Sequence, residues 1–248
     1  MINSDIWSGG GIFDLECTDT LVCKTLKKEY DVELFRRLLE NEFFSLKEMR
    51  ALGLNVPKVF SYVSTDGLCQ IKMERILAKP NYDVYLSHLN TLLTYIESVA
   101  LPKNSVLLEK EWYLSVKNRI LLFSNICPSI KSLDYRKFLD NIQVDCKISL
   151  ILDDWNWENF LFDPNNHFHI IDNRIKWGDR LYNVAGIMVA NSTNCFDISR
   201  FSIAERYRIF LYVLLHYCFQ FEQKKAVGFS TYNIERKIVM SISAINQL

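Results

Sequence analysis

The period of the apolar residues changes once along the chain, and this change limits the folds that the sequence can adopt. Up to about residue 76, short segments with strand-like alternation surround one helical stretch, at about residues 31–52. Beyond that point, helical periodicity dominates at about residues 83–99, 109–123, 133–141, 202–223 and 232–244. Strands and helices that are segregated in this way are typical of an α+β fold.

The composition is that of a globular protein without a strong net charge. The chain has 248 residues, and 49% of them are apolar, which is enough for one large domain or for two lobes. Lysine plus arginine and aspartate plus glutamate both number 29, so no bulk charge favours nucleic acid or an anionic membrane. We therefore expect phosphate binding to depend on local residues, and we expect no nucleic-acid partner.

Seven cysteines are scattered along the chain, and no two of them form a C-x-x-C pair. This pattern indicates reduced thiols rather than a disulfide framework or a zinc ribbon. Asp5 and Asp14 interrupt a signal-peptide core, and the apolar run at residues 209–219 is too short to span a bilayer. We expect a cytoplasmic protein without a transmembrane segment. An exposed apolar face on the C-terminal helices, for a dimer or a membrane surface, stays open, and the oligomeric state is not predicted.

Three consecutive glycines, Gly9, Gly10 and Gly11, lie between two strand-like segments near the N-terminus. Backbone N–H groups in such a turn can close over the phosphates of a nucleotide, and a plain hairpin turn is the alternative. Lys24 follows on the next strand-like segment, where its neighbours are apolar.

The helix expected at residues 31–52 carries one acid that faces the interior. Its apolar residues form a single stripe, and at about 100° per residue Glu42 lies in the middle of that stripe. A buried carboxylate needs a partner, and Lys24 is the natural candidate. In the alternative, the lysine extends to water and the glutamate lies at the edge of the stripe.

A group of polar side chains lies between an apolar segment at residues 146–152 and Asp172. Asp154 follows the apolar segment, Asn159 comes five residues later, and a hairpin with the turn Pro164-Asn165-Asn166 leads to Asp172. A hairpin of this length returns Asn159 and Asp172 to one end, where their oxygens can bind one metal ion. His167 and His169 alternate on the same hairpin, but no third ligand accompanies them, so we expect them to face solvent.

Together these motifs resemble the aminoglycoside phosphotransferase and choline kinase-like family of the protein kinase-like fold. That family carries H-G-D-x-x-x-x-N, then I-D, then G-D, and then Y-D-L-A. The corresponding residues here are Leu152-Asp153-Asp154 with Asn159, Ile171-Asp172, Gly178-Asp179 and Tyr182-Asn183-Val184-Ala185. Lys24, Glu42, the segment N-V-P-K-V-F and the segment M-E-R-I extend the resemblance over most of the chain.

The resemblance implies a two-lobed fold. A small N-terminal antiparallel sheet with one helix would form a nucleotide-binding lobe at residues 1–75. A larger, mainly helical lobe at residues 76–248 would bind the acceptor and carry the catalytic loop. In the N-terminal lobe, Lys24 held by Glu42 would grip the nucleotide phosphates beneath the glycine turn. The backbone groups of Glu74 and Ile76, near the lobe boundary, would meet the edge of the base.

The resemblance also implies the roles of the residues in the C-terminal motifs. Asp154 would orient or deprotonate the acceptor hydroxyl, and Asn159 and Asp172 would bind Mg²⁺. Asp179 would brace the catalytic loop, with Gly178 beside it in a turn. The implied activity is that of a kinase, a transferase that uses ATP or GTP with Mg²⁺ to phosphorylate a hydroxyl of a small molecule or sugar.

The residues around the motifs bear on the acceptor. Only five residues separate Asp172 from Gly178, which leaves no room for a segment that presents a peptide. Trp155, Trp157 and Trp177 could offer aromatic faces to an acceptor, with packing as the alternative. The usual His-Gly before the catalytic aspartate is replaced by Leu152-Asp153. A non-catalytic pseudokinase that binds nucleotide or a protein therefore stays open, as does a kinase for a lipopolysaccharide or capsular sugar.

Overall fold

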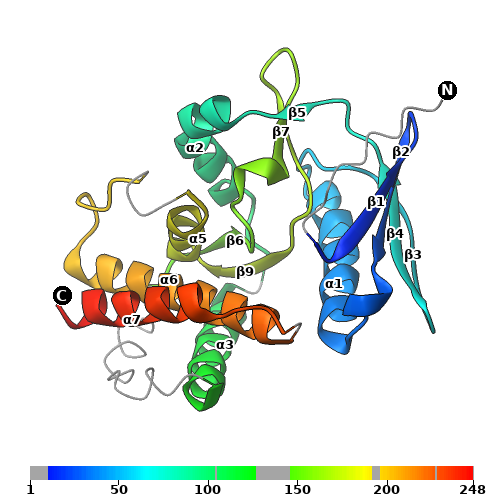
Figure 1. The fold of residues 1–248 in the computed structure, drawn as a ribbon. Coiled ribbons are helices and arrows are strands. Elements are labelled where there is room, and N and C mark those ends of the chain that lie inside the picture. Colours follow the sequence, from blue (N-terminus) through cyan, green and yellow to red (C-terminus); the bar gives the residue numbers. More distant parts are fainter. Residues whose placement is uncertain (1–10, 104, 127–145, 192–195, 227, 248) are drawn as a thin grey trace. The chain divides into compact units, whose positions relative to one another are not determined.

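The computed structural model describes residues 11–103, 105–126, 146–191, 196–226 and 228–247 (Figure 1). The chain forms two compact units, one comprising residues 1–87 and 157–174 and the other comprising residues 88–156 and 175–248. Gly9, Gly10 and the helix expected at residues 133–141 lie outside the described residues. The expected lobe boundary between residues 75 and 76 stays a prediction.

A four-stranded antiparallel sheet dominates the first unit. The strands are β1 (Phe13–Cys17), β2 (Leu21–Leu26), β3 (Val59–Thr65) and β4 (Leu68–Glu74), in the order β1-β2-β4-β3. The turn between β3 and β4 contains Gly67, whose φ of 84° lies in the left-handed region that favours glycine. The register places Lys24 of β2 opposite Leu15 of β1 and Ile71 of β4. Lys24 therefore lies in the middle of the sheet.

The helix of this unit, α1 (Glu33–Ala51), packs against β3 and β4. Its buried residues include Phe35, Leu39, Leu46 and Met49, together with Glu42, so the stripe expected from the sequence is confirmed. Complete burial of an aliphatic or aromatic side chain of this size stabilises the fold by about 1.5 to 3 kcal/mol. The apolar stripe thus fixes the rotation of α1 and carries Glu42 to the sheet.

The rest of the first unit positions a short hairpin beside this sheet. It contains the 3₁₀ helices Lys28–Tyr30 and Trp157–Asn159, a sheet of β5 (Lys79–Pro80), β7 (Phe160–Phe162) and β8 (Phe168–Ile170), and the start of α2 (Tyr82–Glu97). Asn55, in the loop between α1 and β3, anchors the hairpin. Its Nδ2 donates to the carbonyl of Phe168 at 2.8 Å, and its own carbonyl accepts the N–H of Ile170 at 2.9 Å.

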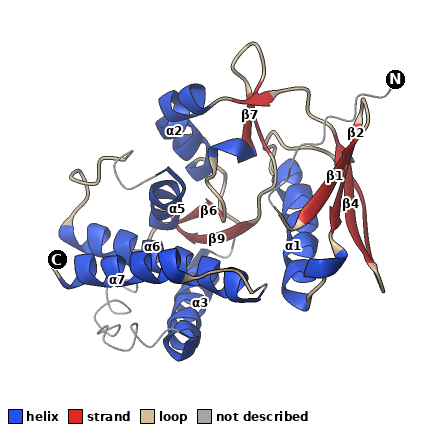
Figure 2. Ribbon diagram, viewed as in Figure 1, coloured by secondary structure: helices blue, strands red, loops and turns tan. Residues whose placement is uncertain are grey.

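Helices predominate in the second unit (Figure 2). They are α3 (Ser105–Ile126), α5 (Leu181–Asn191), α6 (Ile203–Ala226) and α7 (Tyr232–Asn246), and they accompany a two-stranded antiparallel sheet of β6 (Ile148–Leu152) and β9 (Ile175–Asp179). Helix α6 packs on α5 and α7, and α3 packs on β9. Of these elements, α6 is largely buried, while α7 leaves Tyr232, Val239 and Met240 exposed.

Two elements of this unit differ from the sequence expectation. Helix α5 was not predicted, because every residue from Leu181 to Met188 is buried and the helix therefore has no polar face to create a period. The turn expected at Gly178 is wrong, since Gly178 lies inside β9. A Cβ at that position would overlap the ring of Trp112, so the glycine allows α3 to approach the strand.

Among the helices of the described residues, none is long and apolar enough to cross a membrane. The five cysteines that the structure describes are all free thiols: Cys17, Cys23, Cys69, Cys146 and Cys218.

Candidate functional site

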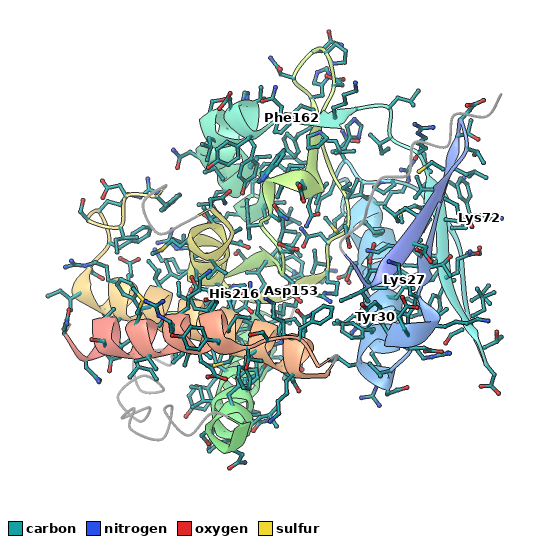
Figure 3. The ribbon with its side chains drawn as sticks, viewed as in Figure 1. Lys27, Tyr30, Lys72, Asp153, Phe162 and His216 are labelled. Atoms are coloured by element: carbon teal, nitrogen blue, oxygen red, sulfur yellow. The ribbon has the colours of Figure 1, made fainter. Side chains whose placement is uncertain are left out.

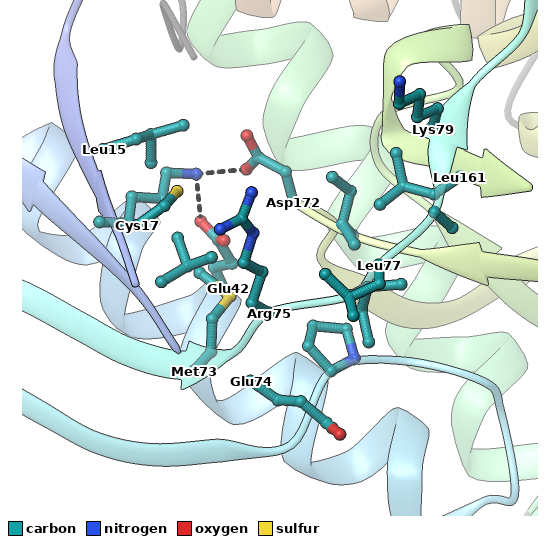
Figure 4. A pocket seen from close by; sticks show the side chains of 16 residues that line it. Leu15, Cys17, Glu42, Met73, Glu74, Arg75, Leu77, Lys79, Leu161 and Asp172 are labelled. Atoms are coloured by element: carbon teal, nitrogen blue, oxygen red, sulfur yellow. Dashed lines mark hydrogen bonds and ion pairs between the residues drawn. The ribbon is translucent and has the colours of Figure 1, made fainter. Parts of the chain in front are cut away.

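Lys24 is the centre of a buried charge cluster in the first unit. Its Nζ donates to Oε2 of Glu42 at 2.8 Å and forms an ion pair with Oδ1 of Asp172 (Figure 4). The side chains of Lys24 and Glu42 are only 4% and 6% exposed, whereas that of Asp172 is 53% exposed. Strand β2, helix α1 and the end of the β7–β8 hairpin each supply one residue. The structure thus brings together three of the residues expected at a nucleotide site.

One ammonium between two carboxylates produces opposite pKa shifts in the two acids. Burial, together with the charge of Asp172, raises the pKa of Glu42 to about 7, and the Lys24 ammonium only partly opposes this. Partial burial also acts to raise the pKa of Asp172, but Lys24 outweighs it and the pKa lies below the ordinary value. Burial acts to lower the pKa of Lys24, and the Asp172 and Glu42 carboxylates outweigh it, so this pKa is raised.

Asp172 has an unusual backbone conformation. Its φ of 49° lies in the left-handed region, where a residue with a side chain is uncommon and costs energy. Non-glycine residues held in this region cluster at functional sites, because the surrounding structure must enforce them. At this hairpin end, the N–H of Ile171 donates to the carbonyl of Asn159 at 2.9 Å. The backbone therefore holds Asn159 next to the residue that precedes Asp172.

The oxygens at this end of the hairpin suit magnesium. Within the described residues there is no group of three or more histidine, cysteine, aspartate or glutamate side chains that could hold a metal ion by themselves. Magnesium in phosphoryl-transfer sites does not require such a group, because one or two protein ligands suffice when waters and phosphates supply the rest. The half-exposed Asp172 carboxylate and the Asn159 amide fit that smaller ligand set.

A pocket of about 480 Å³ adjoins the charge cluster. This volume is large enough for a cofactor-sized ligand. Lys24, Glu42 and Asp172 line it together with mostly apolar side chains (Figure 4). The remaining lining residues are Leu15, Cys17, Val22, Pro57, Met73, Glu74, Arg75, Ile76, Leu77, Ala78, Lys79, Leu161 and Ile171. An apolar pocket with a few convergent charged groups is the usual composition of a small-molecule or cofactor site.

The end of β4 and the segment that follows it form one wall of this pocket, which includes both residues expected at the base edge, Glu74 and Ile76. The Glu74 carboxylate accepts the backbone N–H of Lys58 at 3.0 Å. This contact uses the side chain only, and the role expected for Glu74 concerns its backbone groups. Arg75 was not expected here. Its backbone N–H donates to the carbonyl of Thr20 at 2.8 Å, and its Nη1 donates to that of Thr18 at 2.8 Å.

No sequence signal identifies Arg75, because its contacts depend on the register of β2 against β4. Of the expected glycine turn, the structure describes only Gly11, and the phosphate-binding role of the turn stays a prediction. Gly11 lies just before β1 with a φ of 37°, its carbonyl accepts Nζ of Lys27 at 3.0 Å, and it does not line the pocket.

The expected catalytic residue, Asp154, belongs to the second unit and follows strand β6. It is exposed, and its Oδ1 accepts the backbone N–H of Asn156 at 2.9 Å. The preceding residue, Asp153, points elsewhere and binds Lys176 of β9 at 2.6 Å. The two neighbouring aspartates therefore have separate environments. Trp155 is buried against Gly186 of α5, so this tryptophan is a packing residue and not part of an acceptor surface.

Asp179 has a structural environment at the end of β9. It is fully buried, accepts the hydroxyl of Tyr212 at 3.0 Å and the N–H of Leu181 at 3.2 Å, and lies 3.4 Å from Nε of Arg208. Burial raises the pKa of Asp179, and Arg208 opposes this shift. These contacts tie β9 to α5 and α6, which fits the bracing role expected for Asp179.

Comparison with known proteins identifies the fold. No protein-family model and no curated protein matches the sequence. Among solved structures, the chain is similar to a putative fructosamine-3-kinase from Haemophilus somnus, with 14% identity, coverage of 97% of this chain and 90% of that one, and a TM-score of 0.67. It is also similar to the choline kinase LicA from Streptococcus pneumoniae, with 14% identity, coverage of 97% and 94%, and a TM-score of 0.59.

A third similar structure is the aminoglycoside phosphotransferase APH(4)-Ia in a ternary complex with ADP and hygromycin B. The identity is 13%, the coverage is 98% of this chain and 92% of that one, and the TM-score is 0.60. These similarities, with the small antiparallel sheet and the helical second unit, confirm the protein kinase-like fold that the sequence resemblance implied.

Proposed function

We propose that the protein is a small-molecule kinase that uses ATP or GTP and Mg²⁺ to phosphorylate a hydroxyl of a small molecule or sugar. The observation that carries this proposal is the buried Lys24, held between Glu42 and Asp172 beside a pocket of about 480 Å³. Burying an ammonium is costly unless opposite charges surround it, and here two carboxylates orient one amine. Phosphoryl transfer relies on such positioning and on charge stabilisation.

Each residue of the proposed site has a distinct task. Lys24 donates to the phosphate oxygens of the nucleotide, with Glu42 fixing its direction. Asn159 and Asp172 would hold Mg²⁺, and the bound ion would neutralise the charge that develops on the transferred phosphate. Glu74 and Ile76 offer backbone groups to the base. Binding of nucleotide by two similar folds, LicA with AMP and APH(4)-Ia with ADP, supports this assignment.

Asp154 is the proposed catalytic residue. It is exposed at the end of β6 and precedes Asn159 by five residues, the spacing of the family motif. Its carboxylate would orient the acceptor hydroxyl and take its proton as the phosphate bond forms. Glycines 9 to 11 stay proposed phosphate-binding residues of the same site.

A small acceptor is supported by the chain between Asp172 and Asp179. Strand β9 begins at Ile175, so only Asn173 and Arg174 separate it from Asp172. Two residues cannot form a surface that holds an extended peptide. We therefore favour a small molecule or a sugar, and a cytoplasmic location is part of the proposal because ATP and reduced thiols coexist there.

Two experiments test this function. First, thermal stability is measured with ATP or GTP, with and without Mg²⁺, for the wild type and for Lys24→Met. Stabilisation that requires both Lys24 and Mg²⁺ is expected. Second, nucleoside diphosphate release is measured across aminoglycosides, choline, ethanolamine, amino sugars and hexoses, with Asp154→Asn as the blank.

The outcomes separate the proposal from its competitors. Turnover with one acceptor that vanishes in Asp154→Asn supports the kinase. Nucleotide binding without turnover on any acceptor supports a pseudokinase, which the Leu152-Asp153 replacement of His-Gly favours. Lipopolysaccharide and capsular sugars are screened as a further set of acceptors, and turnover limited to them identifies that third class. The absence of both binding and turnover with every nucleotide refutes the proposal.

A further inference from the structure

The loop that carries Asp154 is held from one side by an ion pair. Asp153 Oδ1 lies 2.6 Å from Nζ of Lys176, and the two side chains are only 22% and 23% exposed. The pair arises from the register of the second unit's sheet, in which Ile151 of β6 lies opposite Lys176 of β9. Asp153 follows directly after β6, two residues beyond Ile151, and its side chain meets Lys176 there.

The position of the Lys176 ammonium is further fixed by aromatic rings. Nζ lies 4.5 Å from the ring centroid of Tyr182 and 5.9 Å from that of Trp112, both within the range of cation–π attraction. The hydroxyl of Tyr182 in turn accepts from Nη1 of Arg119 at 3.4 Å. Lys176 is therefore a fixed point on β9 rather than a mobile surface lysine.

The other side of the same loop is held by Asn183 of α5, which is completely buried. Its Oδ1 accepts the backbone N–H of Leu152 at 3.0 Å and Nε1 of Trp155 at 3.2 Å. Its Nδ2 donates to the carbonyl of Leu150 at 2.9 Å. An aspartate at this position, as in the family motif Y-D-L-A, would lack the donor for that last bond.

Asp154 stays exposed between the groups that make these contacts. Asp153 is occupied by Lys176, Trp155 is buried, and Asp154 between them is exposed (Figure 3 labels Asp153). The loop residues that carry Asp154 on either side are thus attached to β9 and α5.

We propose that Asp153 and Lys176 are positioning residues. Their ion pair fixes the conformation of the Asp154 loop, in which Leu152-Asp153 stand where the family motif has His-Gly. The part of this inference that concerns reaction rate rests on the proposed kinase function. The part that concerns the loop's conformation does not, because it follows from contacts within the second unit.

The test uses the full chain with Lys176→Met and Asp153→Asn, together with Lys176→Arg as the conservative variant. Arg37→Met is the matched control, since it breaks the exposed Arg37–Glu33 ion pair on α1. Hydrogen exchange is followed for the backbone amides of residues 150–158 and, as an internal reference, for those of β2 and β4. Lys176→Met is the most informative variant because its substitution lies outside the 150–158 peptide.

We expect exchange in residues 150–158 to become at least about tenfold faster in Lys176→Met, without a change in β2 and β4. Lys176→Arg and Arg37→Met should leave it near the wild-type rate. With an acceptor found in the turnover screen, kcat should fall about 10- to 100-fold in Lys176→Met and Asp153→Asn, while KM for the nucleotide changes less than about twofold.

The possible results separate the inference from the proposed function. Unchanged exchange at residues 150–158 refutes the inference, whatever the activity. Faster exchange with unchanged kcat refutes the positioning role and leaves the ion pair merely structural. Faster exchange in a protein that has no activity on any acceptor supports the hold on the loop, while the kinase proposal fails separately. If Lys176→Met does not fold, the isosteric Asp153→Asn decides by the same measurements.

Discussion

Replacing Glu42 with glutamine should change how the stability of the protein depends on pH. The pKa of Glu42 rises from its ordinary value of 4.5 to about 7 in the folded protein. Below pH 4.5 the carboxyl is protonated in both the folded and the unfolded chain, so its ionisation does not change the free energy of unfolding with pH. Above pH 4.5 the unfolded chain releases the proton first, and the free energy of unfolding falls until the pH reaches about 7.

The size of this loss follows from the shift. A rise from 4.5 to about 7, at about 1.4 kcal/mol per pKa unit, corresponds to about 3 kcal/mol. The side chain is 6% exposed, so solvent screening does not reduce the figure much. Glutamine cannot ionise and loses nothing over this range. The difference in unfolding free energy, variant minus wild type, should therefore rise by about 3 kcal/mol between pH 4.5 and pH 7.5.

Urea unfolding of both proteins in EDTA, at half-unit steps of pH, measures this difference. The contributions of other titrating groups cancel in the difference, because these groups occur in both proteins. The raised pKa of Lys24 and the lowered pKa of Asp172 lie outside pH 4.5 to 7.5. Glu40→Gln, on the exposed side of the same helix, is the control for losing one carboxylate. A flat difference for Glu42→Gln would mean that burial does not raise its pKa. A difference that falls with pH would mean that attraction by Lys24 exceeds the cost of burial.

Three further predictions concern the second unit. Burial, aided by the charge of Lys176, lowers the pKa of His216 to about 4, so its imidazole should stay neutral in NMR titrations to about that pH, and titration near 6.5 would contradict this. Gly186→Ala should destabilise the protein by about 1 to 3 kcal/mol in urea unfolding, because its Cβ would lie 2.6 Å from Cδ1 of Trp155; a neutral effect would show that the ring can move. Asp179→Ala should cost about 3 to 5 kcal/mol, since it removes the buried carboxylate that lies 3.4 Å from Nε of Arg208 and accepts the hydroxyl of Tyr212, and a loss below about 1 kcal/mol would contradict the pairing.

The parts of the fold that the sequence predicts are those with one polar and one apolar face. Helix α1 is the best example, because its stripe both locates the helix and identifies Glu42 as the inward acid. Helix α5 is the opposite case, since complete burial removes the contrast on which periodicity depends. Gly178 shows a second limit: a glycine that permits close packing against Trp112 looks in sequence like a glycine that permits a turn.

The sequence likewise predicts some residues of the candidate site and not others. Residue types and spacing point to Lys24, Glu42, Asn159 and Asp172, because phosphate and magnesium restrict the chemistry that can serve them. The left-handed conformation of Asp172 has no sequence signal, since tertiary contacts impose it. Glu74 and Ile76 were expected in one wall of the pocket, but the contacts of Arg75 had no sequence signal, because they depend on which strands pair and in which register.

The departures from the family motif in the second unit form a chemically consistent set. Aspartate in place of glycine at position 153 adds a negative charge beside β9, and Lys176 supplies the matching positive charge at 2.6 Å. Asparagine in place of aspartate at position 183 removes a negative charge from a fully buried site and adds the donor that bonds to Leu150. Both contacts join polar groups that are largely shielded from water, so removing one partner of either contact should cost about 1 to 3 kcal/mol. Together they hold the loop by direct contacts, which is why the loss of the motif's histidine does not by itself indicate a disordered or inactive Asp154.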